Sequence, residues 1–372
     1  MRSSFILTLL ASSICSVLAE PLDERIPITK RAGPANANSY IIKLKEGVSK
    51  SAHLASLLSG PKVTYTYDRA FQGYSAQLDG KALEYVRQSK DVEYIVQDEQ
   101  VKLPQISTAE AQVSPRNLGH EHSSLFKRIN GTGVDVYQID TGIYTAHTQF
   151  GGRAKWGATF GGYPSADGNG HGTALASIIV GSTYGVATRA NITAIKCFGD
   201  DGSANLSDII QGINWVISTA TPTGRPSILI VTVTIAGYQP FDNAVTAAIN
   251  QGIHVVVAAG DQNVDASTIS PARVAAAITV GAVAANGNKL PTSNFGSVVD
   301  VWGPGRNVRT AWISSPTAAV NLVGTTESAA SNVAGILAVA IDNHGNKSPA
   351  ALQADLKSNA QTVNGFLIPR IW

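Results

Sequence analysis

The sequence of 372 residues contains few cysteines, few charged residues and few long apolar runs. Its two cysteines, Cys15 and Cys197, exclude a fold held by several disulfides, and Cys197 is expected to be a small core residue at a strand end. Charged residues make up 15% of the chain, the net charge is +2, and no basic run is longer than a pair. This balance does not favour a nucleic-acid partner or a membrane surface.

Metal-ligand spacing is also missing. Apart from His171, the histidines are scattered, and we interpret them as surface or satisfied core residues. They are His53, His120, His122, His147, His254 and His344. The sequence therefore predicts no cofactor and no metal site.

The apolar run near the N-terminus is the exception to the shortage of such runs. Arg2, the run that begins at residues 5–10 and the small-residue exit at 17–19 predict a secretory signal over residues 1–19. Removal of this segment would take Cys15 with it and leave no internal disulfide. No other run is long enough to span a bilayer. We therefore expect a secreted, extracellular protein with glycosylation sequons at Asn130, Asn191, Asn205 and Asn346, of which Asn205 follows a loop-like stretch.

Residues 20–109 predict a small α+β domain. Strands are expected at residues 40–44, 63–67, 71–78 and 92–96, and helices at 52–58 and 82–87. Their order is strand, helix, strand, strand, helix, strand, which is the ferredoxin-like split βαβ arrangement. The polar stretch 103–111 is expected to be unstructured, with a cleavage point near residues 107–112. Lys30 and Arg31 form a dibasic pair in the linker before this domain, either a processing site or a solvated charge pair.

Residues 110–372 alternate strands with helices, which predicts an α/β fold with a parallel sheet covered on both faces. Strands are expected at residues 133–139, 191–196, 228–235, 254–259 and 276–280, and helices at 172–180, 206–218, 243–250 and 327–341.

Two segments of this second domain carry candidate catalytic groups. Asp140 ends the first strand, and His171 opens a helix after the Gly-rich stretch 167–170. The carboxyl end of a parallel strand and the start of a helix meet at the edge where α/β folds bind ligands. A carboxylate that orients an imidazole is one half of an acyl-transfer triad.

Both domains resemble those of a known family. The strings Ile139–Ile143, Asp167–Thr173 and Gly324–Ser328 resemble the subtilisin family, the S8 peptidases, and its fungal proteinase K-like branch. The stretches 184–187, 295–297 and 302–305 are similar to that branch too. Residues 71–76 and 92–98 look like the inhibitory I9-type propeptide of subtilisin zymogens. The resemblance implies a three-layer subtilisin fold, a propeptide that docks on its own enzyme, Asp140 as the orienting carboxylate and His171 as the base.

The remaining two elements of the family's active site depart from its pattern. The family's oxyanion Asn falls at Asp261, and an ionised carboxylate donates no hydrogen bond. The family's Gly-Thr-Ser-Met motif falls on a stretch that is one residue longer here. Counting from Gly324 places Thr326 at the nucleophile, counting back from Gly335 places Glu327 there, and Ser328 takes the role only if the loop shifts.

Three functions remain open at this point. The chain is predicted to be a secreted subtilisin-like peptidase homologue whose proteolysis is weak or lost and which acts by binding. The first alternative is an active serine endopeptidase that uses Asp140, His171 and a shifted Ser328. The second is a non-proteolytic acid/base enzyme that uses Asp140, His171, Asp261 and Glu327.

The expected partners are a peptide or protein ligand and the chain's own propeptide. The family's substrate-pairing strand falls at Ile235, Ala236 and Gly237, where backbone pairing with an extended peptide survives the changed side chains. An aspartate that the branch uses to bind calcium falls at Ala284, so that metal site is expected to be absent.

Overall fold

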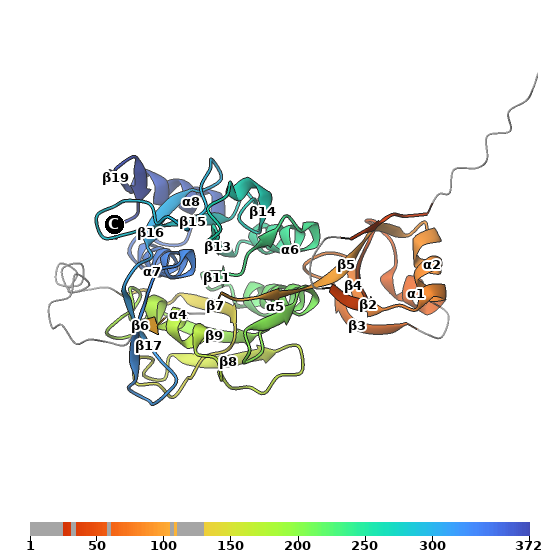
Figure 1. Cartoon of the computed structure of the whole chain (residues 1–372), viewed down its shortest axis with the longest axis horizontal. Helices are drawn as coiled ribbons and strands as arrows, with labels where there is room; N and C mark the ends of the chain where they lie inside the picture. The colour runs from red at the N-terminus through yellow and green to blue at the C-terminus, as the bar shows by residue number, and fades with distance from the viewer. Residues whose placement is uncertain (1–24, 31–34, 58–60, 105–107, 110–129) are drawn as a thin grey trace, which may run out of the picture.

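A computed structural model describes residues 25–30, 35–57, 61–104, 108–109 and 130–372 of the chain. The predicted signal at residues 1–19 and the predicted cleavage region at 110–112 lie outside the described residues. Figure 1 shows two bodies: an N-terminal domain, which ends with strand β5, and a large domain formed by residues 130–372.

The large domain is organised around a seven-stranded sheet whose order is β16-β15-β13-β11-β7-β9-β8, with every neighbouring pair parallel. The strands are β7 (Asp135–Asp140), β8 (Ala154–Thr159), β9 (Asn191–Lys196), β11 (Ser227–Val231), β13 (His254–Ala258), β15 (Ile278–Val283) and β16 (Val301–Pro304). Alternate residues of one strand lie in different apolar clusters: Ile228 and Ile230 face one cluster, and Leu229 and Val231 face the other. This burial on both faces explains why the central strands are continuous apolar runs.

Helices cover both faces of the sheet. Residues of α4 (His171–Val180) and α7 (Thr326–His344) belong to one apolar cluster. Residues of α5 (Leu206–Ala220) and α6 (Gln239–Asn250) belong to the other. The predicted three-layer arrangement, a parallel sheet between two layers of helices, is present.

The strands and helices predicted for the large domain are present, with bounds that shift by a few residues. The largest difference is at 228–235, where the chain leaves the sheet after Val231 and begins a separate short strand, β12 (Ile235–Ala236), which pairs with β14 (Ile269–Ser270). The sequence analysis did not predict β8, β16, β17 (Val308–Ala311), β18 (Ala319–Leu322), α8 (Pro349–Ser358), or the hairpin of β19 (Gln361–Val363) and β20 (Phe366–Ile368). Cys197 is fully buried directly after β9, as expected.

The N-terminal domain has the predicted order of two helices and four main strands. Its elements are β1 (Ile28–Thr29), β2 (Ala35–Leu44), α1 (Lys50–Ser56), β3 (Lys62–Tyr67), β4 (Gly73–Gln77), α2 (Gly80–Gln88) and β5 (Val92–Lys102). Strand β5 is longer than the sequence predicts and leaves its own domain, reaching the space between α5 and α6 (Figure 1). There it pairs antiparallel with β10 (Ser203–Asn205) of the large domain.

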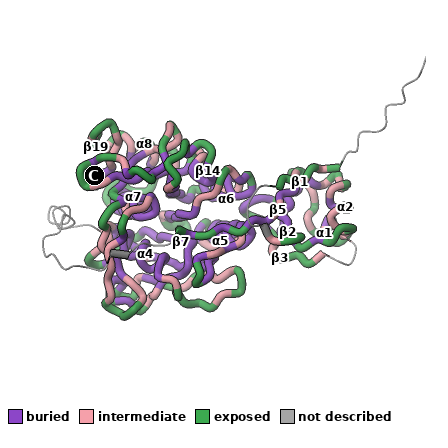
Figure 2. Tube along the Cα trace, in the orientation of Figure 1, coloured by how far each residue is buried: buried purple, intermediate pink, exposed green. Residues whose placement is uncertain are grey.

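The two domains share an apolar core. Tyr67, Phe71, Val101 and Leu103 of the N-terminal part lie in the cluster that includes α5 and α6, and Figure 2 shows buried stretches of both domains at the junction. The stretch 103–111 was expected to be unstructured. Leu103 and Pro104 have no regular secondary structure, as expected, although Leu103 is only 5% exposed. The expectation is wrong for residues 108–109, which form β6 (Thr108–Ala109) and pair with β18.

Polar contacts reinforce this junction. The side-chain carbonyl of Asn214 accepts hydrogen bonds from the backbone N–H groups of Asp68, Arg69 and Ala70 at 3.1, 2.8 and 3.1 Å. The carboxylate of Asp98 accepts the backbone N–H and the hydroxyl of Ser207, at 3.0 and 2.7 Å, in the first turn of α5. Asp98 therefore supplies from the N-terminal domain a cap that the large domain lacks.

We predict that Asn214→Ala lowers the free energy of unfolding of the full chain by about 1–3 kcal/mol, because it leaves a buried N–H group without an acceptor. The matched control is Asn243→Ala, which removes one hydrogen bond to the hydroxyl of Tyr94 at the same junction and an exposed one from Gln239, and should cost less. Urea unfolding midpoints measure both changes. Equal losses in the two variants would contradict the importance assigned to Asn214.

Candidate functional site

Asp140 and His171 meet at the carboxyl edge of the sheet, as predicted. Asp140 ends β7 and His171 is the first residue of α4. The Nδ1 atom of His171 lies 2.8 and 2.9 Å from the two carboxylate oxygens of Asp140, and both side chains are almost completely buried. Gly172 makes this approach possible, since a Cβ there would lie 2.1 Å from the carbonyl oxygen of Gly142.

Asp167 fixes the two segments relative to each other, a role that the sequence analysis did not assign. Its carboxylate accepts the hydroxyl of Thr141, 2.9 Å away and directly after Asp140. It also accepts the N–H groups of Gly170 and Thr173, at 2.8 and 3.0 Å, on either side of His171. Its place ahead of a helix start, in a stretch rich in glycine, was the available signal.

Glu327 is the residue that faces His171 on its other side. One oxygen of the Glu327 carboxylate lies 3.1 Å from His171 Nε2, and Glu327 is 3% exposed. It lies in the first turn of α7, whose N-cap is Thr325. Of the three residues considered for this position, the structure therefore brings Glu327 to the imidazole, in agreement with the count back from Gly335.

These contacts determine the charge of His171. Ionised carboxylates only accept hydrogen bonds, so an imidazole between two of them carries a hydrogen on each nitrogen and is an imidazolium. Burial by itself lowers the pKa of His171, but the attraction of Asp140 and then of Glu327, with a hydrogen bond to each, raises it well above 6.5. An imidazolium has no lone pair with which to remove a proton from a nucleophile.

Asp261, which the family resemblance places at the oxyanion position, holds two hydrogen-bond donors of Thr326. Its carboxylate accepts the backbone N–H of Thr326, at 3.1 Å from each oxygen, and the Thr326 hydroxyl at 2.8 Å. Burial raises the pKa of Asp261 to about 6, and the nearby charge of Glu327 adds to this rise. Donors that would stabilise a developing oxyanion are thus engaged by a carboxylate of the same chain.

Ser328 is part of the helix start. Its N–H donates to the Thr325 hydroxyl at 3.2 Å, its own hydroxyl lies 3.1 Å from the same oxygen, and its side chain is buried. Among the contacts of the described residues, none joins Ser328 to His171. The structure therefore brings together Asp140 and His171 of the predicted catalytic set and places Ser328 elsewhere.

The predicted substrate-pairing strand is present as β12 and its following residue. Ile235 and Ala236 pair with Ser270 and Ile269, and the N–H of Gly237 donates to the carbonyl of Thr268 at 2.7 Å. Ala236 is exposed, while Ile235 and Gly237 are half-buried. A role for these three residues in peptide binding stays a prediction.

The four sequon asparagines have different surroundings. Asn346 is exposed, and its side-chain oxygen accepts from His254 at 2.8 Å. Asn130 is half-buried. The Asn191 amide donates to Asp135 at 3.0 Å, and Asn205 accepts from Asn36 of the N-terminal domain at 2.8 Å. Glycosylation stays a prediction at all four positions.

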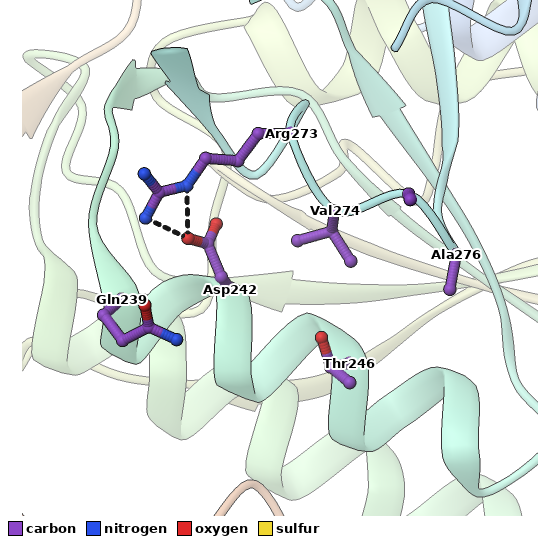
Figure 3. Close-up of a pocket in the computed structure, with 7 residues that line it drawn as sticks. Gln239, Asp242, Thr246, Arg273, Val274 and Ala276 are labelled. Carbon is purple, nitrogen blue, oxygen red and sulfur yellow. Dashed lines mark hydrogen bonds and ion pairs between the residues drawn. The ribbon is translucent and has the colours of Figure 1, made fainter. Parts of the chain in front are cut away.

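A depression lies between α6 and the segment 273–276 (Figure 3). In it Arg273 donates from Nε to the carboxylate of Asp242 at 2.6 Å. Its lining includes no residue of the Asp140–His171–Glu327 group.

Comparison with known proteins identifies the large domain. Residues 131–370 match the model of the subtilase family, Peptidase S8. The chain belongs to the subtilase family. Residues 39–104 of this subtilase match the Peptidase inhibitor I9 family, which confirms the interpretation of the N-terminal domain.

Relatives of this subtilase are fungal proteins. It is 36% identical to Subtilisin-like protease 2 of Pseudogymnoascus destructans, over 86% of this chain and 84% of the relative. It is 35% identical to Proteinase R of Parengyodontium album, over 91% and 89%, and 34% identical to the cuticle-degrading protease of Metarhizium anisopliae, over 97% and 95%. A solved cold-adapted subtilisin-like serine proteinase superposes with a TM-score of 0.61 at 33% identity, over 66% of this chain and 90% of that one.

Within the described part of the chain, the helices are all too short or too polar to cross a membrane.

We predict that Glu327→Gln lowers the pKa of His171, because one of the two flanking negative charges is lost. A raised pKa of His171 stabilises the folded chain below pH 6.5, and this contribution disappears as the pH rises through the folded-state pKa. In Glu327→Gln, this contribution to stability should therefore disappear at a lower pH than in the wild type. NMR titration of the imidazole measures the shift, with Ser328→Ala as the adjacent control. An unchanged His171 pKa in Glu327→Gln would contradict the ion pair.

We predict a second pH effect from Asp261. A carboxyl whose pKa rises on folding, from 3.8 to about 6, makes the folded chain less stable as the pH increases between those values. Asp261→Asn should remove this decline, on the order of 3 kcal/mol for a shift of about two units. Unfolding measured from pH 4 to pH 7 tests the difference from wild type. The exposed neighbour Asp265, changed to Asn, should leave the decline in place.

Proposed function

We propose that this subtilase is a secreted protein without peptidase activity, which acts by binding. One observation carries this conclusion: the Nε2 atom of His171 is occupied by the Glu327 carboxylate at 3.1 Å. Acyl transfer requires that this nitrogen accept the proton of a nucleophile. Here the nitrogen instead donates a hydrogen bond to the Glu327 carboxylate.

The surroundings of Asp261 support the same conclusion. A negative charge beside a developing oxyanion raises the energy of the transition state, and the Thr326 N–H is already bonded to that carboxylate. Loss of one oxyanion donor alone costs roughly 100- to 1,000-fold in turnover. The occupied imidazole and the carboxylate of Asp261 impair the same reaction. Changing only one of the two residues, Glu327 or Asp261, would leave the other defect in place.

Two contacts argue against Ser328 as a displaced nucleophile. Its hydroxyl lies against the Thr325 hydroxyl at 3.1 Å, and its backbone N–H is held by the same side chain. Reaching His171 would require the first turn of α7 to unwind and Glu327 to leave the imidazole.

The cellular destination rests on the sequence. The predicted signal at residues 1–19 supports export, as does the match of residues 39–104 to the I9 module. Export of the full chain into the medium by a eukaryotic host would be the direct observation.

We predict that the purified protein does not react with a fluorophosphonate probe and does not hydrolyse casein or peptide amides. The double variant Glu327→Ser, Asp261→Asn should gain labelling at residue 327, because it supplies a hydroxyl beside His171, frees Nε2 and restores an amide donor. Tryptic mapping of the labelled site decides the result. The control Glu327→Ala, Asp261→Asn frees the imidazole without a nucleophile and should stay unlabelled. Labelling of the wild type at Ser328 would overturn the proposed function.

A further inference from the structure

Strand β5 belongs to both domains at once. Its first half pairs with β2, for example Ile95 with Ile42. Its last residues pair with β10, Gln100 with Asn205 and Lys102 with Ser203, and the N–H of Leu103 donates to the carbonyl of Gly202 at 2.9 Å. The strand therefore continues without a break from one sheet to an edge of the other domain.

The side chains at the end of β5 alternate between exposed and buried, as in a strand with one buried face. Val101 and Leu103 are 7% and 5% exposed and lie in the cluster that contains Phe198 and Leu206, while Gln100, Lys102 and Pro104 are exposed. Two apolar side chains of the N-terminal part thus complete a core of the large domain. Their removal would leave apolar surface of the large domain in water.

Strand β6 lies further along the same chain and pairs with another strand of the large domain. Thr108 and Ala109 pair with Leu322 and Asn321 of β18, and β18 leads within a few residues to Thr325, the cap of the helix that carries Glu327. Strand β10 is joined to the other half of the site. Asp200, just before it, accepts the N–H of Gly168 at 3.2 Å and, through its carbonyl, the amide of Asn169 at 2.9 Å, two residues ahead of His171.

We propose that the N-terminal domain stays covalently joined to the large domain in the working protein, and that β5 and β6 permanently occupy the edges of β10 and β18. The occupant of these two strand edges is then this chain itself. Permanent retention depends on the proposed function, because an active triad could cut the junction.

An intramolecular occupant has a large advantage over an external peptide. A segment that is covalently tethered to its binding site can act at an effective concentration in the millimolar range. Here it is further held by Asp98 at the start of α5, by Asn214, and by the Tyr65 hydroxyl, which donates to Asp208 at 2.8 Å. A peptide added in solution would have to displace both strands and these contacts together.

The intact mass of the secreted full-length protein tests retention. Under denaturing conditions we expect one polypeptide that contains both domains, in a host that lacks its major secreted proteases. Two polypeptides, or a large domain alone, would overturn retention. A fluorophosphonate reaction on the same sample separates the two conclusions: a cut, unlabelled protein refutes retention only, and an intact, labelled protein refutes the proposed function only.

Hydrogen exchange tests the occupancy of the two edges. Amides in 100–103 and 321–322 should exchange at least about 100-fold more slowly than those of the exposed residues 285 and 286. Val101→Asp places a charge in the shared core and should speed exchange in 100–103 and 203–205 by about 10-fold or more. Gln100→Ala changes an exposed side chain on the same strand and should not. Rapid exchange of 100–103 in the wild type would overturn the occupancy.

Discussion

The imidazolium of His171, held between the carboxylates of Asp140 and Glu327, is the interaction on which the functional interpretation depends. Buried charges are costly unless they are paired and hydrogen-bonded, and here one imidazolium is hydrogen-bonded to two carboxylates. These contacts are also the basis of the proposed loss of peptidase activity, because an imidazolium lacks the basicity that acyl transfer requires. The carboxylate of Asp261 holds the N–H and hydroxyl of Thr326, the residue before Glu327.

The rest of the molecule keeps the architecture of an enzyme. The parallel sheet still delivers Asp140 and His171 to one edge, and Asp167 still braces the two segments. The N-terminal domain still docks on α5 and α6 and sends β5 along the large domain. The departures from the family's sequence pattern lie at the start of α7 and in the loop after β13. The fold alone therefore does not decide the chemistry of this chain.

Most of the fold could be predicted from the sequence, because periodicity and turn signals are local. The five predicted strands of the sheet and the order of the N-terminal elements are such cases. The identity of the residue beside His171 could not be decided in this way, since counting from Gly324 and from Gly335 gave different answers. Only the cap at Thr325 and the packing of α7 fix the register. The extension of β5 and the pairing of residues 108–109 were missed for a related reason. The extension is mostly polar and β6 is only two residues long, and both segments become strands by pairing with partners that are distant in the sequence.

The shared core has a practical consequence for anyone who produces this protein. Val101 and Leu103 lie in the apolar cluster that contains residues of α5 and of the segment before it, and Asp98 caps that helix. Each domain leaves apolar side chains at this junction that the other domain buries. A truncated chain that begins at residue 130 would therefore expose an apolar patch and be prone to aggregation. Solubility, like the fold, is a property of the two domains together.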